Sequence, residues 1–300
     1  MIGRINYGGV TWTHLVKPTD ADFNEIIRVY NFHPLTIEDC KTTNHRPKID
    51  KYDDYYFLNL HFPYFVDKIQ TLVDIKEVKI FWGKNFVVTI GKTEWLFTKE
   101  FEKEKIAEKR MTISSSDELL YILIDKVMKA TQKLVDKIDS EVDDCGKNIF
   151  GRKAKKIIEH ISLTRKNVII MNTMFKPQLA IFRKLNTGVI KGFADNMENY
   201  WGSIQDYYQN IWDTVEDAGE LIKGYSKTFD SLQVNKTNEV MKILALVSAI
   251  LLPITFISSV YGMNIKLPIQ DNPNLFIYLG SVMITIILIM LSFFRYKKWM

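Results

Sequence analysis

Two long apolar runs near the C-terminal end dominate the hydropathy pattern of this chain. They cover residues 243–260 and 275–294, and neither contains Asp, Glu, His, Lys or Arg. A helix needs roughly 20 apolar residues to cross the hydrocarbon core of a bilayer. The runs therefore predict a membrane hairpin, whose short connecting loop begins Tyr261-Gly262-Met263-Asn264.

A second periodic pattern precedes the first run. Apolar residues recur there at alternating steps of four and three, which is the 3.5-residue repeat of helices packed along a seam. The pattern is compatible with a helix hairpin inside one chain, but we favour self-association because no helix stop occurs before Gly262. This helix is expected to start near Phe193. The seam residues are Ile204, Tyr208, Ile211, Val215, Ala218, Ile222, Tyr225, Phe229 and Leu232.

Two further helices are expected upstream of this seam. Ser116 or Asp117 is a suitable N-cap for a helix that runs to about Asp144, where Cys145-Gly146 ends the pattern. The next helix is expected over residues 152–183, with Pro177 as a candidate kink.

Residues 1–110 instead mix short strand and helix patterns. Residues 55–62 predict a strand, and residues 78–82 and 86–90 predict a hairpin. Asp20 is a candidate cap for a helix through Tyr30, and residues 36–39 form a second short helical pattern. We therefore expect an α/β domain.

Composition and charge narrow the functional classes. The net charge of +5, from 40 basic and 35 acidic residues, gives no reason to expect nucleic-acid binding. Two cysteines are too few for a disulfide framework or a cysteine-based zinc site. The five histidines show no metal-binding spacing, and no catalytic constellation appears, so we expect no enzyme and no organic cofactor.

Flanking charge predicts the topology of the hairpin. The loop between the spans carries only Lys266, opposed by Asp271. The positive-inside rule places both termini in the cytoplasm and residues 265–274 outside the cell membrane, with lipid as a partner. The basic residues that flank the two spans are Lys236, Lys242, Arg295, Lys297 and Lys298.

One face of the first span carries small and hydroxyl side chains. This stripe has two explanations: close packing between membrane helices, or the lining of an axial pore. The absence of ionisable residues inside the spans argues against a proton-coupled carrier. The stripe consists of Met241, Ala245, Ser248, Leu252, Thr255 and Ser259.

The loop residue Asn264 also has two explanations. Gly262 and Asn264 are both typical of a helix C-cap. In a symmetric oligomer, Asn264 would instead form a ring of amide oxygens that accept hydrogen bonds from a hydrated cation. Magnesium releases its waters reluctantly, so selecting the hydrated ion is chemically reasonable.

The sequence Tyr261-Gly262-Met263-Asn264 between two terminal spans resembles the CorA family of magnesium channels. The resemblance covers essentially the whole chain. Further matching segments are His33-Pro-Leu-Thr-Ile-Glu-Asp39, Arg46-Pro-Lys-Ile-Asp50, Tyr52-Asp-Asp-Tyr55, Asn235-Lys-Thr-Asn238-Glu-Val-Met-Lys242, the first-span residues Pro253, Thr255 and Phe256, and Lys297-Lys298-Trp299-Met300.

The resemblance implies a funnel-shaped homopentamer that conducts magnesium, cobalt or nickel passively. The chain would be an α+β membrane protein with a cytosolic α/β/α domain and a long stalk helix that continues into the first span. Its parts would be a cytosolic α/β domain (1–113), cytosolic long helices and a stalk (114–239), and a two-helix transmembrane pore domain (240–300). Tyr261, Gly262, Met263 and Asn264 would form the selectivity entrance. The pore would be lined or gated by Met241, Leu244, Ala245, Ser248, Leu252, Thr255 and Ser259.

Two departures from the family concern regulation and the entrance. Thr98 and Ser203 stand where family members carry the aspartates of a regulatory magnesium site, so Asp206, Asp213 and Glu100 are candidate substitutes. Lys266 lies near the entrance, where family members commonly have acidic character.

Other interpretations remain open at this level. A zinc or other transition-metal transporter of the same superfamily is one alternative. A membrane-anchored sensor or scaffold is another, in which the hairpin only tethers the cytosolic domain. An acidic run at Asp136, Asp139, Glu141, Asp143 and Asp144 is either a solvated helix face or a means of concentrating cations.

Overall fold

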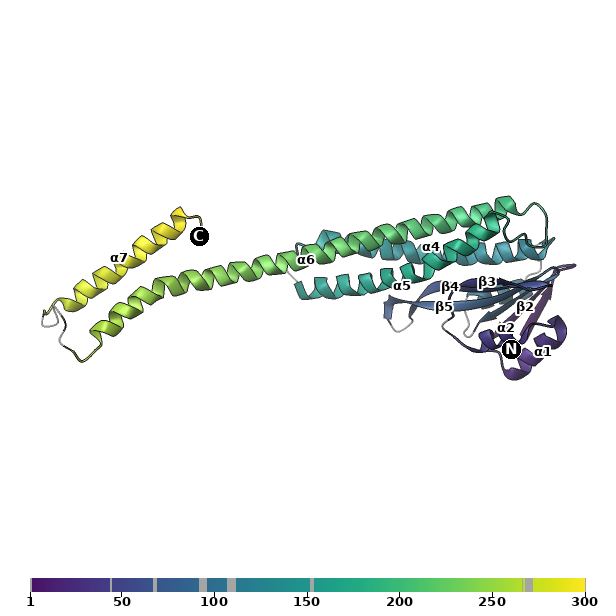
Figure 1. The fold of residues 1–300 in the computed structure, drawn as a ribbon, viewed down its shortest axis with the longest axis horizontal. Helices are drawn as coiled ribbons and strands as arrows, with labels where there is room; N and C mark the ends of the chain where they lie inside the picture. The colour runs from purple at the N-terminus through teal and green to yellow at the C-terminus, as the bar shows by residue number, and fades with distance from the viewer. Residues whose placement is uncertain are drawn as a thin grey trace. The chain divides into compact units, whose positions relative to one another are not determined.

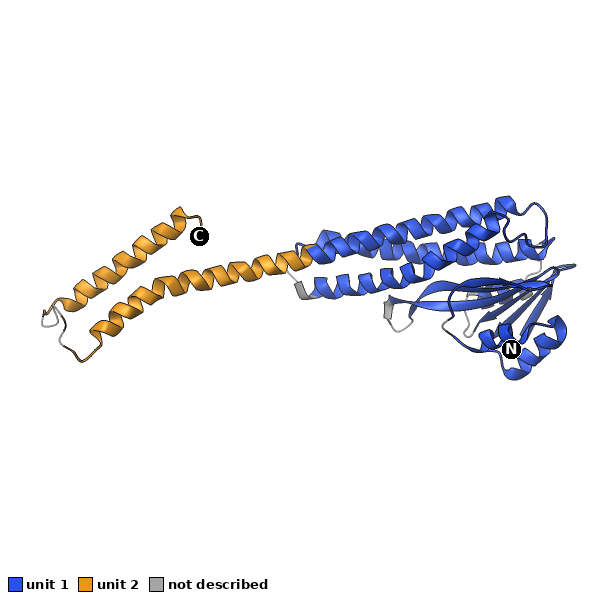
Figure 2. Cartoon of the chain, viewed as in Figure 1, with its two compact units in different colours: residues 1–227 blue, residues 228–300 orange. Residues whose placement is uncertain are grey.

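The computed structural model describes residues 2–43, 45–66, 69–91, 96–106, 112–151, 154–265, 267 and 272–299. The chain divides into two compact units, residues 1–227 and 228–300 (Figure 2). The domain boundaries expected from the sequence, after residues 113 and 239, stay predictions.

The first unit is built on a mixed β-sheet (Figure 1). Among the described residues the strand order is β1-β2-β6-β5-β4-β3, and only β2 and β6 pair in parallel. The predicted strand at 55–62 and the predicted hairpin are confirmed, although β4 and β5 are longer than expected. The strands are β1 (Ile2–Asn6), β2 (Thr11–Val16), β3 (Lys48–Lys51), β4 (Tyr55–Val66), β5 (Ile69–Gly83) and β6 (Phe86–Gly91).

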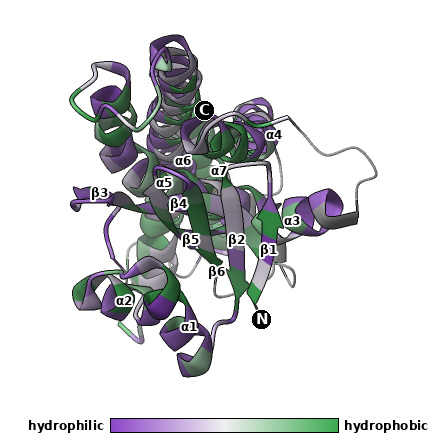
Figure 3. Ribbon diagram, turned by 90° about the vertical axis from the view of Figure 1, so that its right-hand side faces the viewer, coloured by the Kyte–Doolittle hydropathy of each residue, from purple (hydrophilic) through white to green (hydrophobic). Residues whose placement is uncertain are grey.

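Helices α1 (Asp20–Tyr30) and α2 (Pro34–Lys41) cover one face of this sheet. Thr19 rather than Asp20 caps α1, because its side chain and that of Asp22 form a capping box. Phe32 stacks on Phe81 of β5, with ring centroids 3.8 Å apart. Figure 3 shows hydrophobic residues along the middle strands β5 and β6, as expected for strands with helices on both faces.

The opposite face is covered by α4 (Ser116–Asn148) and α5 (Ala154–Asn186). The start of α6 (Glu198–Tyr261) reaches this face at Trp201, whose ring centroid lies 5.9 Å from that of Trp82 in β5. Ser115, not Ser116 or Asp117, is the N-cap of α4, because its side chain accepts a hydrogen bond from the Glu118 amide. The expected α/β/α layering of this unit is confirmed.

Two helix ends differ from the predictions. Helix α4 continues past Cys145-Gly146 to Asn148, since Gly146 is needed for close packing rather than as a stop. Helix α6 starts at Glu198 instead of near Phe193. Residues 187–197 form turns, in which Gly188 and Gly192 adopt φ values of +70°.

Two further helices also differ from what the pattern indicated. Helix α5 continues through Pro177, which was a candidate kink. Helix α3 (Leu96–Ile106) was not predicted, and it packs on β2.

The 3.5-residue seam of α6 is buried within the first unit. From Ile204 to Ile222, every seam residue is at most 3% exposed in the single chain. Tyr208 contacts Phe175 and Phe182 of α5, with ring centroids 5.4 and 4.6 Å away. The expectation of self-association along this part of the seam is therefore wrong, because α4 and α5 supply the apolar partners that the pattern requires.

The second unit contains the rest of α6 and α7 (Leu275–Tyr296). Both helices are long and apolar enough to cross a membrane, with mean hydropathies of 2.4 and 2.5 over their most apolar windows. No residue of either window is buried. Side chains such as Leu252 and Ile277, 72% and 68% exposed, would be costly in water, and a bilayer removes this cost.

Candidate ion pathway and regulatory residues

The turn after α6 is held by backbone hydrogen bonds. The Gly262 amide donates to the Ser258 carbonyl at 2.9 Å, and the Met263 amide donates to the Val260 carbonyl at 3.3 Å. Neither Gly262 nor Asn264 belongs to the residues with positive φ. The cap motifs that favour glycine or asparagine place that residue in the left-handed conformation. Those left-handed cap motifs therefore do not explain Gly262 and Asn264.

The space around Gly262 is limited but not closed. A Cβ atom at this position would lie 3.2 Å from the Ser258 carbonyl oxygen and 3.5 Å from that of Ser259. These contacts are tight, and a shift of a few tenths of an ångström would relieve them. An alanine at position 262 would therefore require this shift of the Ser258 carbonyl.

The face proposed from the sequence as pore lining is exposed along its whole length. Met241 is 61% exposed and Leu244 is 57% exposed. The hydroxyl of Thr255 donates its proton to the Leu251 carbonyl at 2.9 Å, which leaves the oxygen lone pairs to accept hydrogen bonds from water. The remaining positions Ala245, Ser248, Leu252 and Ser259 are also exposed.

The loop beyond the turn is only partly described. Residues 266 and 268–271, which include Lys266 and Asp271, lie outside the described residues. The predicted effect of Lys266 at the entrance stays a prediction.

The three candidate regulatory carboxylates do not meet within one chain. Glu100 forms an ion pair with Lys126, with its Oε2 2.6 Å from the lysine Nζ. Asp206 and Asp213 are exposed on α6, and seven residues separate them by about 10 Å along the helix axis. Among the described residues, no group of three or more His, Cys, Asp or Glu side chains is placed to hold a metal ion.

Each candidate has a different local environment. Asp213 accepts a hydrogen bond from the Gln209 side chain at 2.7 Å. Asp206 lies in a surface hollow of about 730 Å³ that Glu198, Asn199 and Asn210 also line. This set of carboxylate and amide oxygens is the ligand type that magnesium prefers.

Thr98 contacts a buried histidine. Its Oγ1 lies 3.0 Å from Nε2 of the buried His14, whose Nδ1 lies 2.8 Å from Oγ1 of Thr89. Burial lowers the pKa of His14 to about 4, although its hydrogen bond to Thr89 opposes the shift. His14 is therefore neutral at physiological pH.

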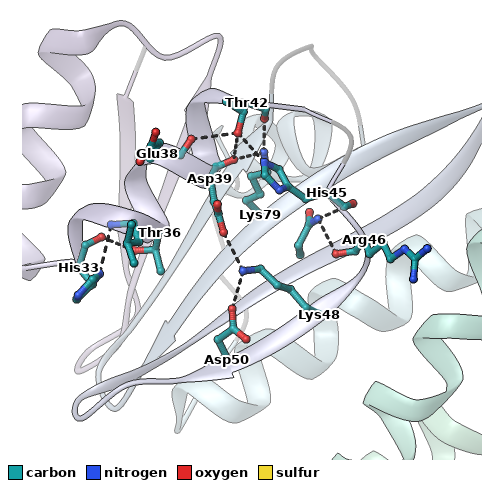
Figure 4. Close-up of polar contacts among 12 residues, drawn as sticks. His33, Thr36, Glu38, Asp39, Thr42, His45, Arg46, Lys48, Asp50 and Lys79 are labelled. Atoms are coloured by element: carbon teal, nitrogen blue, oxygen red, sulfur yellow. Dashed lines mark hydrogen bonds and ion pairs between the residues drawn. The ribbon is translucent and has the colours of Figure 1, made fainter.

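Two of the three N-terminal segments that resemble the CorA family, residues 33–39 and 46–50, come together at the end of α2 (Figure 4). Lys48 Nζ lies 2.8 Å from Oδ2 of Asp39 and 2.7 Å from Oδ2 of Asp50. Partial burial disfavours the charged lysine, but these hydrogen bonds outweigh it and raise the pKa of Lys48. The Lys48–Asp39 contact attaches α2 to β3.

Lys79, which the sequence pattern did not single out, also attaches the end of α2 to the sheet. Lys79 of β5 is 4% exposed, and its Nζ donates to the carbonyls of Asp39 and Thr42 at 2.5 and 2.6 Å (Figure 4). An ammonium group at the C-terminal end of α2 pairs with carbonyls that the helix leaves free. A lysine inside the apolar run of residues 78–82 was the available signal.

The acidic run on α4 is a solvated face with two partly buried members. Asp136, Asp143 and Asp144 are exposed, whereas Asp139 and Glu141 are half-buried. Burial raises the pKa of Asp139, and the nearby carboxylates of Asp143, Asp136 and Asp217 raise it further. This part of the first unit therefore carries concentrated negative charge.

These features define a class of protein: a layered α/β/α domain followed by two helices fit to cross a membrane. The family model described as "CorA-like Mg2+ transporter protein" matches residues 7–298. The chain belongs to the CorA-like Mg2+ transporter family, as the resemblance of its motifs predicted. Members of this family are transporters or channels and not enzymes.

Individual relatives agree with this membership. The cobalt/magnesium transport protein CorA of Thermotoga maritima is 28% identical over 97% of this chain and 83% of its own length. The putative metal ion transporter YfjQ of Bacillus subtilis is 26% identical, covering 96% of this chain and 89% of that protein.

A solved structure has the same fold. The complete CorA magnesium transporter of Methanocaldococcus jannaschii superposes with a TM-score of 0.80, covering 97% of this chain and 92% of that one. At 18% identity this likeness establishes the fold alone.

Proposed function

We propose that this chain is a divalent-cation channel that takes up magnesium passively across the cell membrane and selects the hydrated ion at Asn264. The observation that carries the proposal is the conformation of the turn. Gly262 and Asn264 follow a long apolar helix but lie outside the left-handed region, so a left-handed cap does not explain them. A role in the ion pathway would explain both residues. Cobalt is a further candidate substrate, since one relative is described as a cobalt/magnesium transport protein. Nickel is a candidate from the resemblance of the sequence alone.

The proposed assembly is a funnel-shaped homopentamer with α6 innermost. Tyr261, Gly262, Met263 and Asn264 from each copy would form the entrance on the outer side of the membrane. Met241, Leu244 and Leu252 would form apolar constrictions that block ions by dewetting. Thr255 and Ser259 would offer oxygens to the hydrated ion between them, with Ala245 and Ser248 along the same face. Both termini would lie in the cytoplasm and residues 265–274 outside.

Regulation by intracellular magnesium forms a separate part of the proposal. Glu100, Asp206 and Asp213 do not gather within one chain, so a site built from them would have to lie between neighbouring subunits. The acidic surface around Asp139 would raise the local cation concentration next to the cytosolic domain.

Two other functions predict different outcomes. A zinc or other transition-metal transporter predicts that zinc competes better than magnesium for uptake. A membrane-anchored sensor or scaffold predicts no ion flux at all.

The test is magnesium uptake into proteoliposomes that contain the purified full chain. Asn264→Ala should abolish magnesium-dependent uptake without changing the oligomeric state. Asn274→Ala is a matched control, because Asn274 precedes α7 and its side chain makes no capping hydrogen bond. Normal uptake through Asn264→Ala would contradict the proposed selectivity site, and equal losses in both variants would point to a general effect on the loop.

A further inference from the structure

The C-terminal end of α7 has a Schellman motif with an unusual residue in it. The Trp299 amide donates to the Phe294 carbonyl at 2.9 Å, and the Lys298 amide donates to the Arg295 carbonyl at 3.1 Å. This pair of bonds defines the motif, which places one residue in the left-handed region and favours glycine there. In this chain that residue is Lys298, with φ of 56°.

The motif folds an aromatic ring back onto the helix. The Trp299 ring is stacked on that of Phe294, with centroids 6.1 Å apart and an interplanar angle of 17°. Phe294 is 4% exposed, while Trp299 remains 51% exposed. A half-exposed tryptophan directly after an apolar span is typical of the level of lipid headgroups.

Three cations surround this turn. Arg295, Lys297 and Lys298 are all exposed, and in the described part of the chain none of them has an ion-pair partner. From position 275 to position 299 the sequence contains no Asp or Glu. The local charge is therefore concentrated and uncompensated, next to a helix whose apolar length fits a bilayer.

We propose that Arg295, Lys297 and Lys298 form a binding site for the phosphate of an anionic phospholipid headgroup, held in shape by the Schellman motif and by the Trp299–Phe294 stack. The partner follows from charge complementarity and from the position of the cluster at the end of a membrane span. A lysine at the left-handed position is less favourable for the backbone than glycine would be. Its charge gives it a role that glycine lacks.

The substitution Lys298→Gly separates charge from backbone. Glycine adopts the left-handed conformation without strain, so this variant should keep the turn and fold at least as well as the parent chain. One basic residue near an anionic surface contributes enough for roughly a fivefold change in association. Lys298→Arg keeps the charge and should keep the binding.

The experiment measures the association of spin-labelled phosphatidylglycerol and phosphatidylcholine with the purified full chain in phosphatidylcholine bilayers. The parent chain should prefer phosphatidylglycerol, and the preference should weaken at high salt. Lys298→Gly should weaken it roughly fivefold. The control is Lys17→Gly in the first unit, where a lysine also has positive φ, of 47°, and this variant should bind phosphatidylglycerol like the parent.

Several results would overturn the proposal. One is equal association of the two lipids with the parent chain. Another is full phosphatidylglycerol preference in Lys298→Gly. Displacement of the lipid by millimolar inorganic phosphate would show a general anion site instead of a headgroup site. Each result is independent of ion conduction, since the assay detects lipid and not flux.

Discussion

The side-chain amide of Gln178 on α5 donates a hydrogen bond to the hydroxyl of Tyr208 on α6 at 2.8 Å, and neither residue is accessible to water. The same glutamine accepts from the His61 amide at 2.7 Å and donates to the His61 carbonyl at 3.0 Å. One side chain therefore joins β4, α5 and the seam of α6. Burial raises the pKa of Tyr208 well above its usual value, so the hydroxyl stays protonated.

This relationship predicts unequal losses of stability. Tyr208→Phe keeps the packed ring and removes one hydrogen bond, so it should lower the free energy of unfolding by about 1 kcal/mol. Gln178→Leu should cost about 3 kcal/mol or more, because it leaves the buried amide and carbonyl of His61 without partners. Chemical unfolding of the full chain in detergent measures both. Equal losses would contradict the central role of Gln178.

The contact between α4 and α6 predicts opposite effects of two glycine substitutions. A Cβ at Gly146 would lie 2.6 Å from the hydroxyl oxygen of Tyr225, whereas a Cβ at Gly224 would meet nothing within 4 Å. Gly146→Ala should therefore destabilise the protein by about 1–3 kcal/mol through overpacking. Gly224→Ala, the matched control, should stabilise it by up to about 1 kcal/mol through helix propensity.

Thermal unfolding of the two variants side by side checks this prediction. If Gly146→Ala were as stable as the parent chain, α4 and α6 would not approach each other as closely as the structure has them.

His14 predicts a loss of stability in acid. Its pKa is about 4 in the folded protein and 6.5 in the unfolded chain, so between these values only the unfolded chain binds the proton. The contribution of His14 is complete above pH 6.5 and is lost as the pH falls towards 4. The total loss is about 3 kcal/mol at most. His14→Gln should make unfolding less dependent on pH across this window, and an unchanged pH profile would contradict a buried neutral His14.

The sequence was most informative where one periodic pattern decides the structure. Both candidate membrane helices, α4, α5 and the strand at 55–62 follow from apolar spacing and length alone. The seam of α6 shows the limit of such reasoning. Its spacing indicates that the helix packs along its length, but not against which partner, and the partners turned out to be α4 and α5 of the same chain.

Other features depend on contacts that are distant in sequence. Strands β1, β2 and β3 are short, and they are defined by their neighbours more than by their own pattern: β1 pairs with β2, β2 with β6 and β3 with β4. The role of Lys79 depends on α2, which lies about 40 positions earlier. For the proposed ion pathway, the motif singled out Asn264, and only the backbone conformation showed that a left-handed helix cap does not explain this residue.

The most direct test of the account is the ionic current carried by the purified full chain in a planar bilayer under a magnesium gradient. A channel predicts a passive magnesium current without ATP, which Asn264→Ala abolishes and Asn274→Ala leaves intact. The absence of any current from correctly assembled protein would contradict the account and favour a membrane-anchored sensor or scaffold.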